Sequence, residues 1–152
     1  MPTWLIDTML LTLFVVGTAS RDYILKHKRL GPYRESDFDQ LVSLLSQASG
    51  IVVTPNILTE TSNWLKMIRE PARSHIAATF QQFIGVFEER YIASSEAALD
   101  PEFSRLWLTD SGILRELTNG HVLLTSDSAL YATALQRGFQ AVNFSELRSS
   151  FT

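Results

Sequence analysis

Four acidic residues stand at points in the sequence where a strand is expected to end or a helix to begin. Asp7 and Asp127 directly follow the apolar runs WLI and VLLTS. Glu60 lies about one helical turn beyond the run IVV, and Asp110 opens a helical pattern. The carboxyl ends of parallel strands share one edge of a sheet, where ligands bind in α/β proteins. Four carboxylates gathered there would repel one another unless a hard divalent cation lay between them. The pattern therefore predicts a phosphodiesterase site that depends on Mg²⁺ or Mn²⁺.

The elements that must position these carboxylates alternate along the chain. Short apolar or β-branched runs indicate strands, and apolar residues at helical spacing indicate helices between them. This alternation predicts a single α/β domain over residues 1–152, with a parallel central sheet of four or five strands and helices on both faces. Strands are expected at 3–7, 51–54, 121–127 and 139–144, and a short strand is conceivable at 91–94. Helices are expected at 8–17, 20–29, 36–49, 55–68, 71–90, 101–108, 109–119, 128–138 and 145–150.

Helix boundaries are predicted from capping residues. Thr8 is expected to cap the first helix and Thr109 the helix that carries Asp110. Ser36 followed by Asp39 resembles a capping box, and Pro55 suits the first position of the helix after IVVT. Glycines are expected to end four helices, at Gly17, Gly50, Gly120 and Gly138.

Composition limits the classes of function. The chain has 152 residues and no cysteine, which excludes disulfides, zinc–thiolate sites and cysteine nucleophiles. The net charge is −3, so the protein does not bind nucleic acid as a bulk polycation, and phosphates would have to be attracted by local patches. The apolar run 8–17 is too short to span a bilayer, and no basic residue precedes it, so we interpret it as a buried helix rather than a signal peptide.

Three segments resemble the PIN-domain family, and most closely its VapC-type ribonuclease toxins. They are LIDTMLL at 5–11, VTPNILTETSN at 53–63, and LTDSGIL together with VLLTSDSALYATALQRGFQAVNF within 108–144. The third is the most specific, because a Thr-x-Asp at a strand end precedes a helix, a glycine and another strand. The resemblance covers nearly the whole chain, although the spacings of about fifty residues between acidic positions leave room for extra helices.

The resemblance implies a metal-dependent endoribonuclease. It implies catalytic and metal-binding roles for Asp7, Glu60, Asp110 and Asp127, and a supporting role for Thr125. The first and last aspartates are the expected direct ligands of Mg²⁺ or Mn²⁺, while Glu60 either ligates or positions the attacking water. Each acidic residue by itself could be a helix cap or a solvated side chain. Asn63, one turn from Glu60, is a further candidate for the site.

A basic and aromatic stretch is a candidate RNA-contact surface. Its basic residues would bind phosphates and its aromatic residues could stack on unpaired bases, although a solvated helix face explains the same pattern. The cationic candidates are Lys26, Lys28, Arg29 and Arg34, with His27, Tyr23 and Tyr33 between them. Arg69, Arg73 and His75 form a weaker second candidate. We expect His121 to be structural, and Trp4, Trp64 and Trp107 to lie in the core or an interface.

Other functions stay open. An aspartyl-phosphate phosphatase would need Asp-x-Asp after the first strand, and a phospho-receiver a late lysine, and the chain has neither. A PIN-like scaffold that binds RNA or protein without cleaving, and a PIN nuclease of RNA processing that is not a toxin, remain alternatives. The resemblance to toxins implies a cytoplasmic homodimer without membrane contacts, and an antitoxin that inserts a basic side chain into the acidic cleft.

Overall fold

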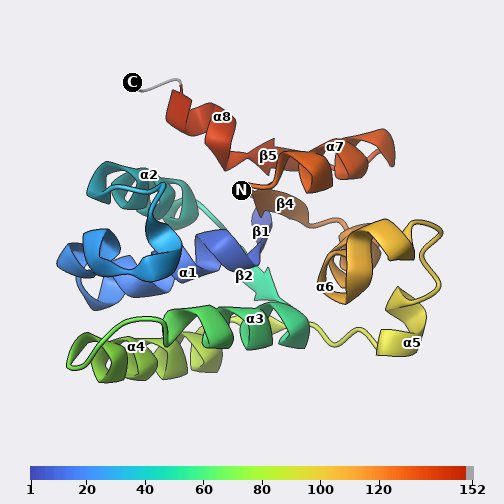
Figure 1. Ribbon diagram of the computed structural model, residues 1–152. Coiled ribbons are helices and arrows are strands. Elements are labelled where there is room, and N and C mark those ends of the chain that lie inside the picture. The colour runs from blue at the N-terminus through green and yellow to red at the C-terminus, as the bar shows by residue number, and fades with distance from the viewer. Residues whose placement is uncertain (150–152) are drawn as a thin grey trace.

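A five-stranded sheet forms the centre of the computed structural model, which describes residues 1–149 (Figure 1). The spatial order of the strands is β3-β2-β1-β4-β5, and every neighbouring pair is parallel, which confirms the predicted α/β class and parallel sheet. The strands are β1 (Thr3–Ile6), β2 (Gly50–Val53), β3 (Glu88–Glu89), β4 (Val122–Thr125) and β5 (Ala141–Asn143).

Helices cover the sheet on both sides. In Figure 1, α1 and α2 lie to the left of the strands and α6 lies to the right. Helix α1 packs against α2, α3 and α4, and α3 also contacts α6. The α-helices are α1 (Thr8–Ala19), α2 (Glu35–Ser46), α3 (Pro55–Leu65), α4 (Ala72–Val86), α5 (Ser94–Ala97), α6 (Phe103–Glu116), α7 (Ser128–Gln136) and α8 (Phe144–Ser149). The 3₁₀ helices are η1 (Arg21–Lys26), η2 (Lys28–Leu30) and η3 (Leu117–Asn119).

The two central strands are apolar on both faces, as expected for strands buried between helical layers. Leu5 and Ile6 of β1 and Leu123 and Leu124 of β4 are fully buried in the hydrophobic core. Ile6 pairs with Leu124, so the residues that follow these strands emerge side by side at one edge. The chain continues this pairing, because the backbone N–H of Asp7 donates to the carbonyl of Leu124 at 3.1 Å.

Several predicted helix boundaries are wrong because other residues satisfy the backbone groups. Asp7, and not Thr8, caps α1, with its carboxylate accepting from the N–H of Leu10. The carboxylate of Asp37 accepts from the N–H of Arg34 at the start of α2, so the predicted pairing of Ser36 with Asp39 does not form the cap. The predicted start of α3 is confirmed, with Thr54 as N-cap and Pro55 in the first turn.

Glycine was a poor guide to helix ends in the first half of the chain. Helix α1 continues past Gly17 to Ala19, and α2 ends at Ser46, so that Gly50 begins β2. The helix expected at 20–29 consists of η1 and η2. No strand forms at 91–94, and the edge strand is instead β3.

The boundary between two helices that is predicted at Thr109 lies instead at Trp107. Helix α6 is interrupted at Trp107, whose φ of 60° and ψ of −167° are not helical. Thr109 and Asp110 therefore lie inside the helix that follows, and Thr109 is not its cap. Within residues 1–149, no helix is both long and apolar enough to cross a membrane.

Candidate active site

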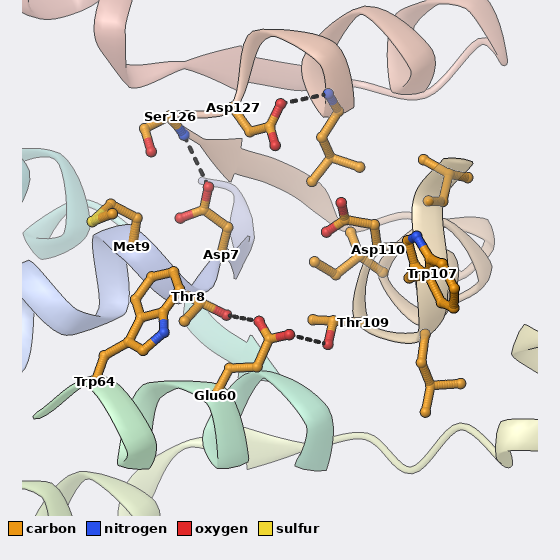
Figure 2. A pocket seen from close by; sticks show the side chains of 14 residues that line it. Asp7, Thr8, Met9, Glu60, Trp64, Trp107, Thr109, Asp110, Ser126 and Asp127 are labelled. Carbon is orange, nitrogen blue, oxygen red and sulfur yellow. Dashed lines mark hydrogen bonds between the residues drawn. The ribbon is translucent and has the colours of Figure 1, made fainter. Parts of the chain in front are cut away.

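One open cleft is lined by all four predicted carboxylates. It has a volume of about 620 Å³ and lies where the ends of β1 and β4 meet helices α3 and α6. Figure 2 shows Asp7 and Asp127 beyond the strands, Glu60 rising from α3, and Asp110 projecting from α6. The described residues that line this cleft include no lysine, arginine or histidine. The structure thus brings together four acidic side chains separated by up to 120 positions in the sequence.

Asp7 is the most firmly held carboxylate. Its Oδ1 accepts from the N–H of Leu10 at 3.0 Å, and its Oδ2 accepts from the hydroxyl of Thr125 at 2.5 Å and from the N–H of Ser126 at 2.9 Å. The Thr125 hydroxyl also accepts from the N–H of Asp127 at 3.0 Å. Thr125 is fully buried, so its role is to fix the carboxylate orientation rather than to contact a ligand in the cleft.

Glu60 is held by two threonine hydroxyls from different elements. Thr8 at the start of α1 donates to Oε1 at 2.9 Å, and Thr109 of α6 donates to Oε2 at 2.7 Å (Figure 2). These bonds fix the orientation of the Glu60 carboxylate in the cleft and connect α1, α3 and α6. Both oxygens keep a lone pair for a further partner, because each hydroxyl occupies only one.

Asp127 and Asp110 keep more of their oxygen atoms open. Asp127 caps α7 through Oδ1, which accepts from the N–H groups of Ala129 and Leu130, while its Oδ2 accepts no hydrogen bond from the described residues. Neither oxygen of Asp110 accepts a hydrogen bond within residues 1–149. Asp110 is therefore the carboxylate whose charge the surrounding chain compensates least.

The electrostatics of the cleft reflect this lack of compensation. The pKa of Asp110 is raised from 3.8 to about 7, first by burial and then by the negative charges of Asp127, Glu60 and Asp7, against a smaller opposing effect of the positive charge of Arg105. Burial also raises the pKa of Asp7, and the charge of Asp127 adds to the rise, while the bonds from Thr125, Leu10 and Ser126 oppose it. A cation in the cleft would relieve both effects.

The donor set matches the ligand preference of Mg²⁺ or Mn²⁺, because every charged group in the cleft offers only oxygen. Within residues 1–149, however, no group of three or more acidic or histidine side chains is arranged so that it could hold a metal ion. Mg²⁺ usually keeps several waters and takes only one or two carboxylates directly. The open oxygens of Asp110 and Asp127 are compatible with this mode of binding.

The predicted RNA-contact stretch is only partly available at the surface. Lys26 and Lys28 are exposed and line a second hollow together with Arg69. Arg29 lies over the ring of Trp64, 4.0 Å from its centroid, and Arg34 is exposed at the start of α2.

The aromatic part of that prediction is wrong for two residues. His27 and Tyr33 are buried, with exposed fractions of 3% and 5%. The Nε2–H of His27 donates to the carbonyl of Leu65, and the ring of Tyr33 packs beneath Arg148. Neither can stack on an incoming base, because packing against the protein occupies its ring.

Sequence reasoning missed four residues that shape the cleft. The sequence predicts helix caps at Thr8 and Thr109, yet the hydroxyls of both residues donate to Glu60. Trp64 and Trp107 line the cleft, whereas Asn63 is exposed and does not. The signal for Trp64 was its position four residues after Glu60, which places both on one helix face. Trp107 carries no such signal, because its exposure depends on the break in α6. Trp4 is buried, as expected.

Comparison with known proteins adds no family assignment: a scan against protein-family models and a search of curated proteins each gave no match. The relation to PIN domains therefore rests on the sequence motifs.

Proposed function

We propose that this protein is a metal-dependent endoribonuclease of the PIN type. The observation that supports this function best is the convergence of Asp7, Glu60, Asp110 and Asp127 on one cleft without a basic residue. Hydrolysis of a phosphodiester needs a site that concentrates negative oxygens around a cation and leaves room for a substrate. The cleft, with its volume of about 620 Å³ open to solvent, has such room.

In this proposal each acidic side chain has a distinct role. Asp127 and Asp110 would hold Mg²⁺ or Mn²⁺ directly, and Asp7 would ligate through its remaining lone pairs or through water. The bound ion would supply Lewis-acid activation of the phosphodiester and of a water molecule. Because the pKa of Asp110 is about 7 without metal, binding of the ion at this carboxylate would displace a proton at neutral pH, and the bound Asp110 would stay ionised. Glu60, held between Thr8 and Thr109, would orient water rather than act as the base.

The wider biological role follows from the resemblance to VapC-type toxins. We propose a toxin that acts on RNA in the cytoplasm as a homodimer, and an antitoxin that closes the cleft with a basic side chain. The absence of lysine and arginine among the lining residues leaves the acidic charge available to such a partner.

One observation favours a second candidate, a PIN-like scaffold that binds RNA or protein without cleaving. Among the described residues, no acidic group is prearranged to hold a metal ion. The two functions differ in one property, since a scaffold would bind without any metal-dependent hydrolysis.

The deciding experiment is cleavage of total RNA by the purified protein with Mg²⁺, with Mn²⁺ and with EDTA. Asp127→Asn and Asp110→Asn are the best inactivating variants. Asparagine at 127 keeps the Oδ1 that caps α7, and Asp110 has no hydrogen bond to lose. Asp7→Asn is less suitable, because both oxygens of Asp7 accept hydrogen bonds and the NH2 group of asparagine would face a donor in either orientation. Asp22→Asn, exposed on η1, is the control.

We expect discrete fragments with either metal, none with EDTA, and a loss of at least about 100-fold in rate for both inactivating variants. Asp22→Asn should cleave like the wild type. Intact RNA from the wild type under every metal condition would support the scaffold instead.

A further inference from the structure

Trp107 combines exposure with a backbone conformation that tryptophan rarely adopts. Its side chain is 68% exposed at the rim of the acidic cleft. Its φ of 60° and ψ of −167° fall in a region that is occupied almost only by glycine. Residues held there cluster at functional sites, because the folded chain must hold them against the strain. The only ring near Trp107 in the described chain is Phe103, at 6.0 Å between centroids.

A second tryptophan faces the cleft from the other side. Figure 2 shows Trp64 of α3 and Trp107 of α6 on opposite sides of the carboxylates. Trp64 is half-buried, and the guanidinium of Arg29 covers its ring at 4.0 Å from the centroid. Because Arg29 covers a face of the Trp64 ring, what this pair offers to an RNA is the positive charge of the guanidinium, which can contact a phosphate.

The residue next to Arg29 in the chain is also basic. The neighbouring residue Lys28, together with Lys26 and Arg69, lines the second hollow, which has a volume of about 810 Å³. Figure 2 places the exposed indole of Trp107 and the covered indole of Trp64 on either side of the carboxylates, and the three cations line the second hollow together with Glu70. Single-stranded nucleic acid is bound by this kind of surface, in which aromatic rings stack on bases and cations follow the backbone.

We infer that Trp107 is a stacking position for an unpaired nucleobase of a single-stranded RNA, which crosses the cleft toward Trp64 and Arg29. This inference rests on the proposed function, because it names the substrate form and the residue that positions it. Trp107 would act through binding and not through bond cleavage. A double helix cannot use this position, because its paired bases have no free faces.

The test is the affinity of a short fluorescein-labelled single-stranded RNA, measured by fluorescence anisotropy in Mg²⁺. Every protein carries Asp127→Asn, so that the RNA stays intact. The variants compared are Trp107→Phe, Trp107→Leu and Trp107→Gly, with Leu99→Ala as the control. Leu99 is 81% exposed and does not line the cleft, so its removal tests the loss of any exposed apolar side chain.

We expect Trp107→Phe to bind within about three-fold of the parent, and Trp107→Leu and Trp107→Gly to bind about five-fold or more weakly. Leu99→Ala should bind like the parent, and a duplex of the same sequence should show no dependence on Trp107. Trp107→Gly should also melt about 2–8 °C higher than Trp107→Leu, because glycine relieves the backbone strain. If Trp107→Gly binds RNA more weakly but is more stable than Trp107→Leu, the loss of binding cannot be attributed to loss of folding.

Equal affinity of the leucine and phenylalanine variants would overturn the inference, as would the same loss on the duplex. A shift from dimer to monomer in Trp107→Leu, with RNA affinity unchanged, would assign Trp107 to a protein contact instead. Failure of the nuclease proposal has a different signature. RNA would remain uncleaved by the protein with Asp127 intact, while the dependence of binding on an aromatic residue at 107 persisted.

Discussion

At the scale of single residues, the carboxylates of the cleft differ in the hydrogen bonds that they accept. Asp7 accepts three hydrogen bonds and Glu60 two, whereas Asp110 accepts none from the described residues. Hydrogen bonds to a charged carboxylate stabilise it, so Asp7 and Glu60 are fixed in place. Asp110 is held only by its helix, and its charge costs stability until a cation or a proton neutralises it.

This cost predicts that Asp110→Asn stabilises the metal-free protein at neutral and alkaline pH. The folded-state pKa of about 7 lies above the ordinary value of 3.8, so the folded state binds more protons than the unfolded state between those values. The contribution of Asp110 to stability therefore falls as pH rises through this range. The advantage of asparagine should grow from near zero at about pH 4 to about 1–2 kcal/mol at about pH 8.

Urea unfolding in EDTA at several pH values measures this difference, with Asp22→Asn as the matched control. A constant difference between Asp110→Asn and the wild type across the pH range would contradict the electrostatic origin of the effect.

At the scale of elements, α1 presents the first carboxylate and must lie close to its neighbours to do so. Gly17 permits the contact between α1 and α2, because a Cβ at this position would lie 2.2 Å from Cδ2 of Phe38. The Phe38 ring is buried, so it has little room to move. Asp7 caps the start of α1, so any tilt of α1 away from α2 would also change the geometry at Asp7 and Thr8.

Gly17→Ala is therefore expected to destabilise the protein by about 1–3 kcal/mol, even though alanine favours helices. Gly85→Ala is the control, because Gly85 lies in α4 with nothing within 4 Å of an added Cβ. That change should be neutral or stabilise by up to about 1 kcal/mol. Chemical denaturation gives both values. The double variant Gly17→Ala, Phe38→Leu should recover part of the lost free energy of unfolding. A Gly17→Ala protein as stable as the wild type would show that the Phe38 ring can move without cost.

At the scale of the whole molecule, the cleft joins four regions of the chain that the sheet brings together. The parallel pairing of β1 with β4 aligns Asp7 with Thr125, and the contact of α3 with α6 lets Glu60 and Thr109 meet. The fold therefore holds several negative charges at one point, and a divalent cation that binds there should stabilise the folded state as a whole.

We expect Mn²⁺ at about 100 times its dissociation constant to raise the melting temperature by about 5–10 °C, the shift that a stabilisation of about 2.7 kcal/mol produces. At one fixed Mn²⁺ concentration the shift should be larger at about pH 8 than at about pH 6, because protons compete for Asp110, whose pKa is about 7 without metal. Differential scanning fluorimetry measures this directly. The double variant Asp110→Asn, Asp127→Asn should lose the shift, and an unchanged shift would place the metal elsewhere.

The parallel sheet and the four carboxylates are predictable from the sequence. Apolar runs such as VLLT and the acidic residues that follow them are local signals, and the rule that parallel strands end at one edge needs no coordinates. The start of α3 at Thr54 and Pro55 was equally readable, because a cap and its helix are adjacent in the chain.

The differences between those carboxylates, and the residues around them, depend on contacts between elements that are distant in the sequence. Thr8 and Thr109 look like caps in the sequence, and they hold Glu60 because packing brings α1 and α6 against α3. The burial of Tyr33 and the exposure of Trp107 run against their sequence neighbours, because Tyr33 lies between Pro32 and Arg34 and Trp107 lies between two leucines. The burial of Tyr33 depends on its contact with Arg148, and the exposure of Trp107 depends on the break in α6. Neither a long-range contact nor a strained backbone changes the periodicity of apolar residues in the sequence.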